Sequence, residues 1–458
     1  MNSMASVAAR ALPPAVAAPA AAPAAVRWGF PELFVISQTA LPALLYLPGS
    51  QAIRLPIRFS AFGISLAAFA WWLLQSHERP PAHRTQPWVI AVMGLMAVML
   101  SSPYTGSLMG GLAHMMVYFA VIAPLFWAPV FVRTPEHLAR LLGILLICSG
   151  INSMVGVLQV YDPARFMPAE LSRVVTEGAF GLGAVTYDGP NGRMIIRPPG
   201  LFDTPGAVAG PGMFAALLGV IFGLSPIAAW KRAGSFAFAG AGIAAIYLSQ
   251  VRISLVVTLL MFGIYAVTLV MQRRAAKATA FALLAGGIVA ASFVGAITLG
   301  GSSILTRFMT LFAEDPLAVY YRARGVQLDI TFSQLLFDYP LGAGLGRWGM
   351  AAAYFGTPGL PGIWAEIQIT GWMIDGGILM LVFYLGALLA TARSEYRLAL
   401  QTRYPRIAVC AGVVFSANLG IAAMIFSFTP FVTQIGIQYW FLAGALHGVA
   451  CHYRLNEA

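Results

Sequence analysis

The stretch Ile253-Ser-Leu-Val-Val-Thr-Leu-Leu-Met-Phe-Gly-Ile-Tyr-Ala-Val-Thr-Leu-Val-Met-Gln272 is typical of the segments that decide this fold. Most of its residues are apolar and none is charged. Arg252 flanks it on one side, and Arg273 and Arg274 flank it on the other. Roughly 20 apolar residues in an α-helix cross the hydrocarbon core of a bilayer, where the backbone must satisfy its own hydrogen bonds. The stretch therefore predicts a membrane-spanning helix.

The composition of the whole chain agrees with this. Of its 458 residues, 59% are hydrophobic and 9% are charged, against roughly 25% charged in a soluble domain. This excludes a water-soluble globule. The net charge of +11 lies mostly beside apolar runs, which favours a membrane over nucleic acid as its cause. Only Lys231 and Lys277 are lysines, and the preference for arginine suits paired contacts to phosphate or carboxylate.

Hydropathy predicts about twelve transmembrane helices. The expected spans are 29–49, 58–76, 87–102, 111–132, 137–160, 205–229, 234–250, 253–272, 278–299, 367–392, 407–427 and 430–450. If both chain ends are cytoplasmic, every cytoplasmic connection carries Arg or Lys, as the positive-inside rule requires. We therefore expect an all-α, polytopic membrane protein with both ends inside.

Two connections are too long for turns, and both fall on the extracytoplasmic side. The predicted order is a disordered Ala/Pro-rich cytoplasmic tail (1–28), helices 1–5 (29–160), a loop (161–204), helices 6–9 (205–299), a larger loop (300–366), and helices 10–12 with a short cytoplasmic end (367–458). For the N-terminal stretch, a cleaved signal peptide is the alternative. Within the larger loop, residues 317–337 have the periodicity of an amphipathic surface helix. Loops of this length are usually functional, so we expect the chemistry there.

The loops concentrate charge but carry no pattern for a metal. They hold eight arginines, Arg165, Arg173, Arg193, Arg197, Arg307, Arg322, Arg324 and Arg347. The glycines of 342–346 predict a flexible backbone that a ligand can approach, and Tyr187 to Gly192 predicts a turn. The cysteines show no CxxC spacing and the loops contain no histidine. Neither a structural metal nor a cofactor is expected.

Three stretches, in order, resemble the O-antigen ligase and O-antigen polymerase family of bacterial envelope glycosyltransferases. Arg197-Pro-Pro-Gly-Leu-Phe-Asp-Thr-Pro-Gly206 is similar to its R-x-x-G-x-F-x-x-P-N motif, and Ser249-Gln-Val-Arg-Ile-Ser254 to its S-R-small element. The third combines Arg322 or Arg324, the run Pro340-Leu-Gly-Ala-Gly-Leu-Gly346, and the helix start from Trp364 to Leu379. The resemblance implies a multi-span GT-C-like fold with two long periplasmic loops. It covers about 197–390 by motif.

The resemblance also implies site residues. Glu366 lies where ligases of this family carry a histidine, which moves the expectation from ligase to repeat-unit polymerase. As a carboxylate it can accept a proton from an attacking sugar hydroxyl. A lipid diphosphate leaving group needs stabilisation of its charge, which arginines can supply in pairs. The candidate diphosphate ligands are Arg252, Arg324, Arg322 and Arg197; the candidate glycan contacts are Asp203, Arg347 and Trp364.

Each of these residues also has a structural alternative. Arg252 can snorkel to a lipid phosphate, and Arg197 can simply pair with Asp203. Glu366 can cap the helix that it precedes. Arg322 and Arg324, two residues apart on a helix, must point to different faces, and the sequence does not say which one meets a ligand. Asp375, deeper in the helix that follows Glu366, is expected to be a buried structural acid beside Gly376 and Gly377.

The expected activity is metal-independent polymerisation of undecaprenyl-diphosphate-linked oligosaccharide units of an exopolysaccharide, capsule or O-antigen, at the periplasmic face of the bacterial inner membrane. The first alternative is a ligase that transfers glycan to lipid A core or protein, and the second is a polysaccharide or lipid transporter without transferase activity. Scarce ionisable residues within the spans argue against the transporter. The expected partners are the lipid-linked oligosaccharide, membrane lipids, a chain-length regulator (polysaccharide co-polymerase) and a flippase, with no nucleic acid.

Overall fold

The computed structural model describes residues 28–47, 49–75, 79–172, 181–313, 315–356 and 362–455. The tail predicted at 1–28 therefore lies, apart from Trp28, outside the described residues. Within them the chain is almost entirely helical, and seven helices are long and apolar enough to cross a membrane. The protein thus has the all-α character of a multi-pass membrane protein.

Each of these seven helices lies at a predicted span. They are α2 (Arg54–Leu74), α4 (Leu108–Ile122) joined to α5 (Pro124–Phe131), α6 (Pro135–Tyr161), α11 (Arg252–Met271), α12 (Ala275–Gly300), α18 (Gln368–Gln401) and α19 (Pro405–Ala423) with the turn that continues it. Five further helices occupy the remaining predicted positions: α1 (Phe30–Ala43), α3 (Gln86–Met99), α9 (Ala209–Gly223), α10 (Ala229–Ser249) and α20 (Gln434–His452).

The helix α9 is shorter than the predicted span at 205–229. Its 15 residues extend about 23 Å at 1.5 Å per residue, less than a hydrocarbon core of about 30 Å. The chain before it cannot be helical, because Gly206 has a φ of +82° and follows Pro205. α9 packs closely on α10: a Cβ on Gly212 would lie 2.8 Å from the carbonyl oxygen of Gly242. Small residues permit this close approach of helices.

The helix α18 extends past its predicted end at 392, and it is broken where the sequence reads Gly376-Gly377. Gly377 has a φ of +61°, and a Cβ there would lie 2.0 Å from the carbonyl oxygen of Pro340. The loop at this point completes the interrupted helix: Ala343 N–H donates to the carbonyl of Ile374 (2.7 Å), and Ile378 N–H donates to that of Pro340 (3.0 Å). The break is thus built into the packing of the loop.

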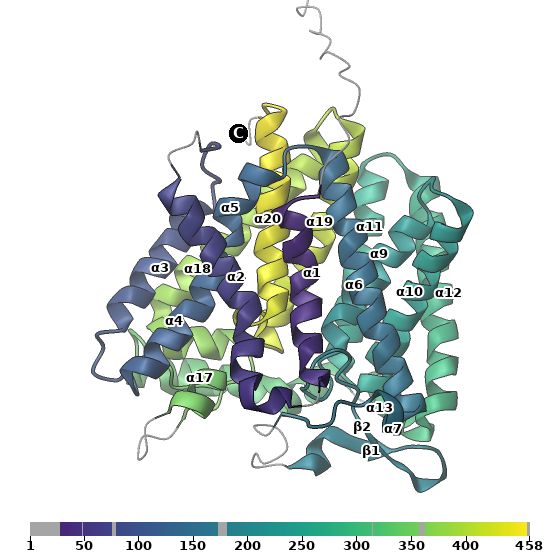
Figure 1. The fold of residues 1–458 in the computed structure, drawn as a ribbon, viewed down its shortest axis with the longest axis horizontal. Helices are drawn as coiled ribbons and strands as arrows, with labels where there is room; N and C mark the ends of the chain where they lie inside the picture. The colour runs from purple at the N-terminus through teal and green to yellow at the C-terminus, as the bar shows by residue number, and fades with distance from the viewer. Residues whose placement is uncertain are drawn as a thin grey trace, which may run out of the picture.

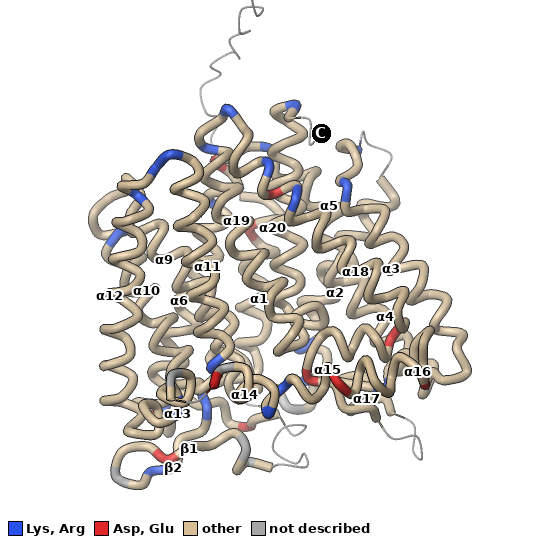
Figure 2. The backbone as a smooth tube through the Cα atoms, turned by 180° about the vertical axis from the view of Figure 1, so that it is seen from behind, with Lys and Arg blue, Asp and Glu red and all other residues tan. Residues whose placement is uncertain are grey.

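The helices form one bundle with two distinct ends. In Figure 1, α1 begins and α20 ends at the same end, which we call the terminal face. At the other end, the loop face, Figure 1 shows α7 (Pro163–Phe166), β1 (Thr186–Asp188), β2 (Met194–Ile196), α13 (Ser302–Ala313) and α17 (Gly349–Phe355). Figure 2 shows α14 (Pro316–Tyr320), α15 (Val326–Ile330) and α16 (Leu336–Asp338) at the same end. Figure 2 shows Lys and Arg gathered at the terminal face, and most Asp and Glu at the loop face beside further arginines.

The loop face contains two small structures that position side chains. The segment predicted as a surface helix at 317–337 lies within continuous helical turns from 316 to 338, with π-helical turns at Tyr321–Gly325 and Thr331–Leu335. The strands β1 and β2 pair antiparallel, with Tyr187 opposite Ile195. The predicted turn at 187–192 overlaps the end of β1 and includes the connection between the strands. This hairpin is a departure from the purely helical expectation.

Candidate functional site

Three arginines from separate segments meet at the loop face, and we call them the arginine cluster: Arg197, Arg252 and Arg307. Arg197 directly follows β2, Arg252 is the first residue of α11, and Arg307 lies in α13. Gln250, with a φ of +55°, turns the chain sharply between α10 and α11. This confirms that Arg252 stands on a very short turn between two apolar helices.

The position of α13 brings the third arginine to the other two. Ser303 Oγ donates to the carbonyl of Asp188 at 2.6 Å, which ties the start of α13 to the hairpin. On the side of the helical bundle, the ring of Phe308 packs against that of Tyr247 with 4.8 Å between centroids. The helix therefore lies between the hairpin that leads to Arg197 and the end of α10 that leads to Arg252.

The pKa of Arg307 reflects its burial and the charges of the other two arginines. Burial lowers the pKa of Arg307 to about 10, and repulsion from Arg252 and then Arg197 adds to this. Burial also lowers the pKa of Arg197, against an opposing effect of Tyr187. A guanidinium with a pKa of about 10 still carries its charge at neutral pH. The cluster is thus a concentration of positive charge whose mutual repulsion destabilises the folded protein.

Several donors of the cluster have no partner within the described protein. The Nε atoms of Arg197 and Arg307 are buried without a hydrogen bond, as is the hydroxyl of Tyr187. Arg252 Nη1 donates to Thr310 Oγ1 at 2.6 Å. Among the ion pairs of the described residues, none involves these three arginines. Buried donors and unpaired cations together are the features of a site for a multiply charged anion.

Asp203 does not pair with Arg197, which corrects that alternative. Its carboxylate is 3% exposed and lies between two arginines of α2: Arg54 Nε is 3.0 Å from Oδ2, and Arg58 Nε donates to the same oxygen at 3.1 Å. Arg58 Nη1 also donates to the hydroxyl of Tyr354 (3.1 Å). Asp203 therefore anchors the segment before α9 to α2. Arg197 thus has no ion-pair partner among the described residues. The glycan contact proposed for Asp203 remains a prediction.

A second group surrounds Glu366, and we call it the acidic group. The carboxylate of Glu366 forms an ion pair with Arg324 and accepts a hydrogen bond from Trp364 Nε1 at 3.2 Å. Glu366 does not cap the helix, because Ile367 is the N-cap of α18 and no side chain caps it. Instead, the buried amide oxygen of Gln327 accepts from the backbone N–H of Glu366 (2.9 Å) and of Ile367 (3.2 Å). The acid is held at the edge of α18, partly exposed, with a cation beside it.

The structure distinguishes the two arginines that the sequence could not. Arg324 pairs with Glu366, whereas Arg322 is exposed and its Nε donates to the carbonyl of Ala318 at 3.4 Å. They do point to different faces, as their spacing predicts. Trp364 is 53% exposed, so its ring remains open to a partner beside Glu366. Arg324 is thus the cation of the acidic group, and the diphosphate contact expected of Arg322 remains a prediction.

Arg347 lies in the packing of the loop. It is buried, and its Nη1 donates to the carbonyls of Tyr104 (3.2 Å) and Ala343 (3.3 Å). The neighbouring glycine run is also packed: a Cβ on Gly344 would lie 2.4 Å from the backbone nitrogen of Thr105. The backbone here approaches the protein itself, so the prediction that it stays open for a ligand is wrong. The physical reason is that the loop fills the break in α18.

Asp375 is the buried structural acid that the sequence predicts. Its exposure is 0%, and its carboxylate accepts hydrogen bonds from Trp348 Nε1 (2.9 Å) and the Tyr118 hydroxyl (2.8 Å). His114 Nε2 lies 3.1 Å from Oδ2. These three partners tie α4 and the loop before α17 to α18, directly beside the helix break.

Arg307 is the member of the arginine cluster that sequence reasoning missed. It was one of eight loop arginines with nothing to separate it from the rest. A signal does exist in the sequence, because Ile304, Phe308 and Leu311 recur at helical spacing and Arg307 adjoins this apolar face. In the structure Ile304 and Phe308 are buried. A cation on the buried face of an amphipathic helix is unusual and points to a partner.

Comparisons with known proteins add no name to these groups. No model of a known protein family matches the chain, and no curated protein matches it. Among the residues that the structure describes, no three His, Cys, Asp or Glu side chains are grouped so that they could hold a metal ion. The chemistry of the loop face is therefore that of two groups of residues. One is a buried cationic cluster, and the other is a carboxylate with an arginine and a tryptophan beside it.

Proposed function

We propose that this chain is a membrane glycosyltransferase that polymerises oligosaccharide units carried on undecaprenyl diphosphate. The arginine cluster carries the proposal, because it offers three guanidinium groups and buried unpartnered donors, and no described carboxylate forms an ion pair with them. A diphosphate is the anion that such a set fits best, since each guanidinium can donate to two phosphate oxygens. The resemblance of the motifs that contain Arg197 and Arg252 supports the same substrate.

The proposed setting is the bacterial inner membrane, crossed about twelve times, with the loop face in the periplasm. A helix lies at each of the twelve predicted positions within the described chain. α1 begins and α20 ends at the same face (Figure 1), which agrees with an even number of crossings. The basic connections at that face agree with a cytoplasmic location (Figure 2).

In the proposed reaction, a hydroxyl of one lipid-linked unit attacks the anomeric carbon of another. The new bond joins the hydroxyl oxygen to that carbon, while the bond from the carbon to the diphosphate breaks with inversion. Glu366 takes the proton of the attacking hydroxyl, and Arg324 and Trp364 orient its carboxylate. The arginine cluster stabilises the charge on the departing lipid diphosphate. The chain's own residues can carry out these steps without a metal.

The proposed partners are the lipid-linked oligosaccharide, the surrounding lipids, a chain-length regulator and a flippase. The nearest competing function is a ligase that passes finished glycan to lipid A core or protein. Glu366 in place of the ligase histidine favours the polymerase. A transporter would bind the same diphosphate but would move it without joining units.

The test is elongation by the purified full chain given only lipid-linked repeat units. Longer oligomers are expected from the wild type. Glu366→Gln should lower the elongation rate about 100-fold or more, because it removes the base, and should leave binding of inorganic pyrophosphate unchanged. Arg252→Ala should weaken both elongation and pyrophosphate binding.

The matched control is Asp338→Asn, which removes an exposed carboxylate from the same face. It should leave both measurements unchanged. Normal elongation by both site variants would refute the site. Loss of long chains from lipopolysaccharide on gene deletion, with polymer still accumulating on the lipid carrier, would establish the ligase instead, and movement of substrate without any joining would establish the transporter.

A further inference from the structure

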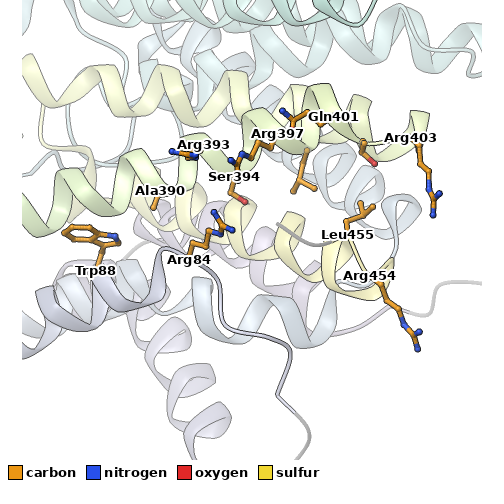
Figure 3. Close-up of a pocket in the computed structure, with 12 residues that line it drawn as sticks. Arg84, Trp88, Ala390, Arg393, Ser394, Arg397, Gln401, Arg403, Arg454 and Leu455 are labelled. Atoms are coloured by element: carbon orange, nitrogen blue, oxygen red, sulfur yellow. The ribbon is translucent and has the colours of Figure 1, made fainter. Parts of the chain in front are cut away.

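A second arginine-rich site lies at the terminal face, at the opposite end of the helical bundle from the loop-face groups. A cavity of about 660 Å³ opens between the end of α18 at the terminal face, the start of α3 and the chain's last described residues. Arginines from four segments line it: Arg84, Arg393 with Arg397, Arg403 and Arg454. Figure 3 shows Arg84, Arg393 and Arg397 gathered near Ser394, with Arg403 and Arg454 further along.

The charged side chains in the described lining of this cavity are all arginines. Among the described side chains that line it, none is an acid. Glu395, the nearest acid along the chain, is 2% exposed and accepts a hydrogen bond from Asn418 at 2.6 Å. Ser394 is buried, and its Oγ has no hydrogen-bond partner. A cationic rim with a hydroxyl at its base fits phosphate oxygens.

An apolar stripe leads away from the cavity along α18. Leu389 lies one turn before Arg393 on the same helix face, and Leu385 and Val382 continue the row at helical spacing. Their exposed fractions are 71%, 37% and 49%. Trp88 of α3 lies over the helix beside this row, where a Cβ on Gly386 would come within 2.5 Å of the Trp88 ring. The cationic pocket therefore continues directly into an exposed apolar surface.

We propose that this cavity binds the phosphate headgroup of an anionic phospholipid, with an acyl chain along Val382, Leu385 and Leu389. A soluble phosphate compound would use the arginines equally well, but it would gain nothing from the stripe. Basic pockets between transmembrane helices on the cytoplasmic side are suited to lipids that carry two phosphates. The chemistry is thus that of a cardiolipin-type lipid, and the site is separate from the proposed substrate site.

The experiment is native mass spectrometry of the full chain in detergent, titrated in separate arms with cardiolipin, phosphatidylcholine and inorganic pyrophosphate. Cardiolipin should bind at least tenfold more tightly than phosphatidylcholine. Arg84→Gln with Arg393→Gln should lower cardiolipin affinity about tenfold or more, since each arginine near a lipid headgroup contributes on the order of 1 kcal/mol. Both residues are exposed, so this variant should fold.

The control is Arg133→Gln with Lys277→Gln, which removes the same charge from exposed positions of the same face outside the cavity. It should keep the wild-type affinity. Leu389→Gln should weaken cardiolipin and leave pyrophosphate unaffected. An equal loss of cardiolipin affinity in the control would show that the effect comes from general surface charge and not from the cavity. If the cavity variant lost pyrophosphate affinity while Leu389→Gln left cardiolipin binding intact, a soluble phosphate ligand would replace the lipid.

Discussion

Removing Arg307 should have opposite effects on stability and on binding. The guanidinium lies beside Arg252 and Arg197 and is partly buried, so in the unliganded protein its charge is repelled and poorly solvated. The variant Arg307→Gln keeps most of the side-chain volume and removes the charge. It should stabilise the unliganded protein and lower its affinity for a diphosphate. A residue kept for packing alone would do neither.

The magnitude follows from the pKa. The fall of the Arg307 pKa from its ordinary value to about 10 corresponds to about 3 kcal/mol at about 1.4 kcal/mol per pKa unit. The side chain is partly exposed, so solvent screening reduces this to roughly 1–2 kcal/mol of stability gained by Arg307→Gln. On binding, a charge-assisted hydrogen bond contributes about 1.5–3 kcal/mol, so pyrophosphate affinity should fall about 10- to 100-fold.

Two measurements on the same detergent-purified samples check this. Thermal unfolding should show a higher midpoint for Arg307→Gln than for the wild type, and calorimetry should show weaker pyrophosphate binding. Arg165→Gln, which removes an exposed arginine of α7 from the same face, should change neither. A lowered midpoint together with unchanged binding would refute the reasoning, because it would show that Arg307 stabilises the fold and meets no anion.

Three further outcomes are expected. Pyrophosphate affinity should fall as the pH rises through about 10, where Arg307 loses its proton. Because its folded pKa lies below its unfolded value, the charge of Arg307 destabilises the folded protein below pH 10, and this destabilisation disappears as the pH rises above about 10. Gly377→Ala should destabilise by more than about 2 kcal/mol, through its positive φ and the contact with Pro340, visible as a lower thermal midpoint. Asp203→Asn should cost about 3 kcal/mol in the same assay by leaving two buried arginines short of an anion, whereas Asp188→Asn, at an exposed position, should cost little.

The positions of the apolar helices were predictable from the sequence alone. A run of roughly 20 apolar residues has few other stable arrangements, because the cost of unsatisfied backbone groups in a bilayer is local to the segment. The boundaries were less predictable. α9 begins late because Gly206 takes a positive φ, and α18 continues to Gln401 because its last turns pack at the terminal face.

The candidate site was also only partly predictable from the sequence. The motifs around Arg197, Arg252 and Glu366 were visible in the sequence, but their partners were not. Spacing along the chain allowed an Arg197–Asp203 pair, whereas in the fold Asp203 pairs with two arginines of α2. Ion pairs depend on three-dimensional distance, and a separation of six residues in an irregular segment says little about it.

The sequence by itself determined that this is a helical membrane protein and which end of the bundle carries its charged loops, because hydrophobic length and charge placement act segment by segment. The tertiary structure alone decided that Arg307 joins Arg197 and Arg252, that Arg324 pairs with Glu366, and that the glycine run fills a break in α18. These are contacts between segments far apart in the chain, and their energies exist only once the helices have packed.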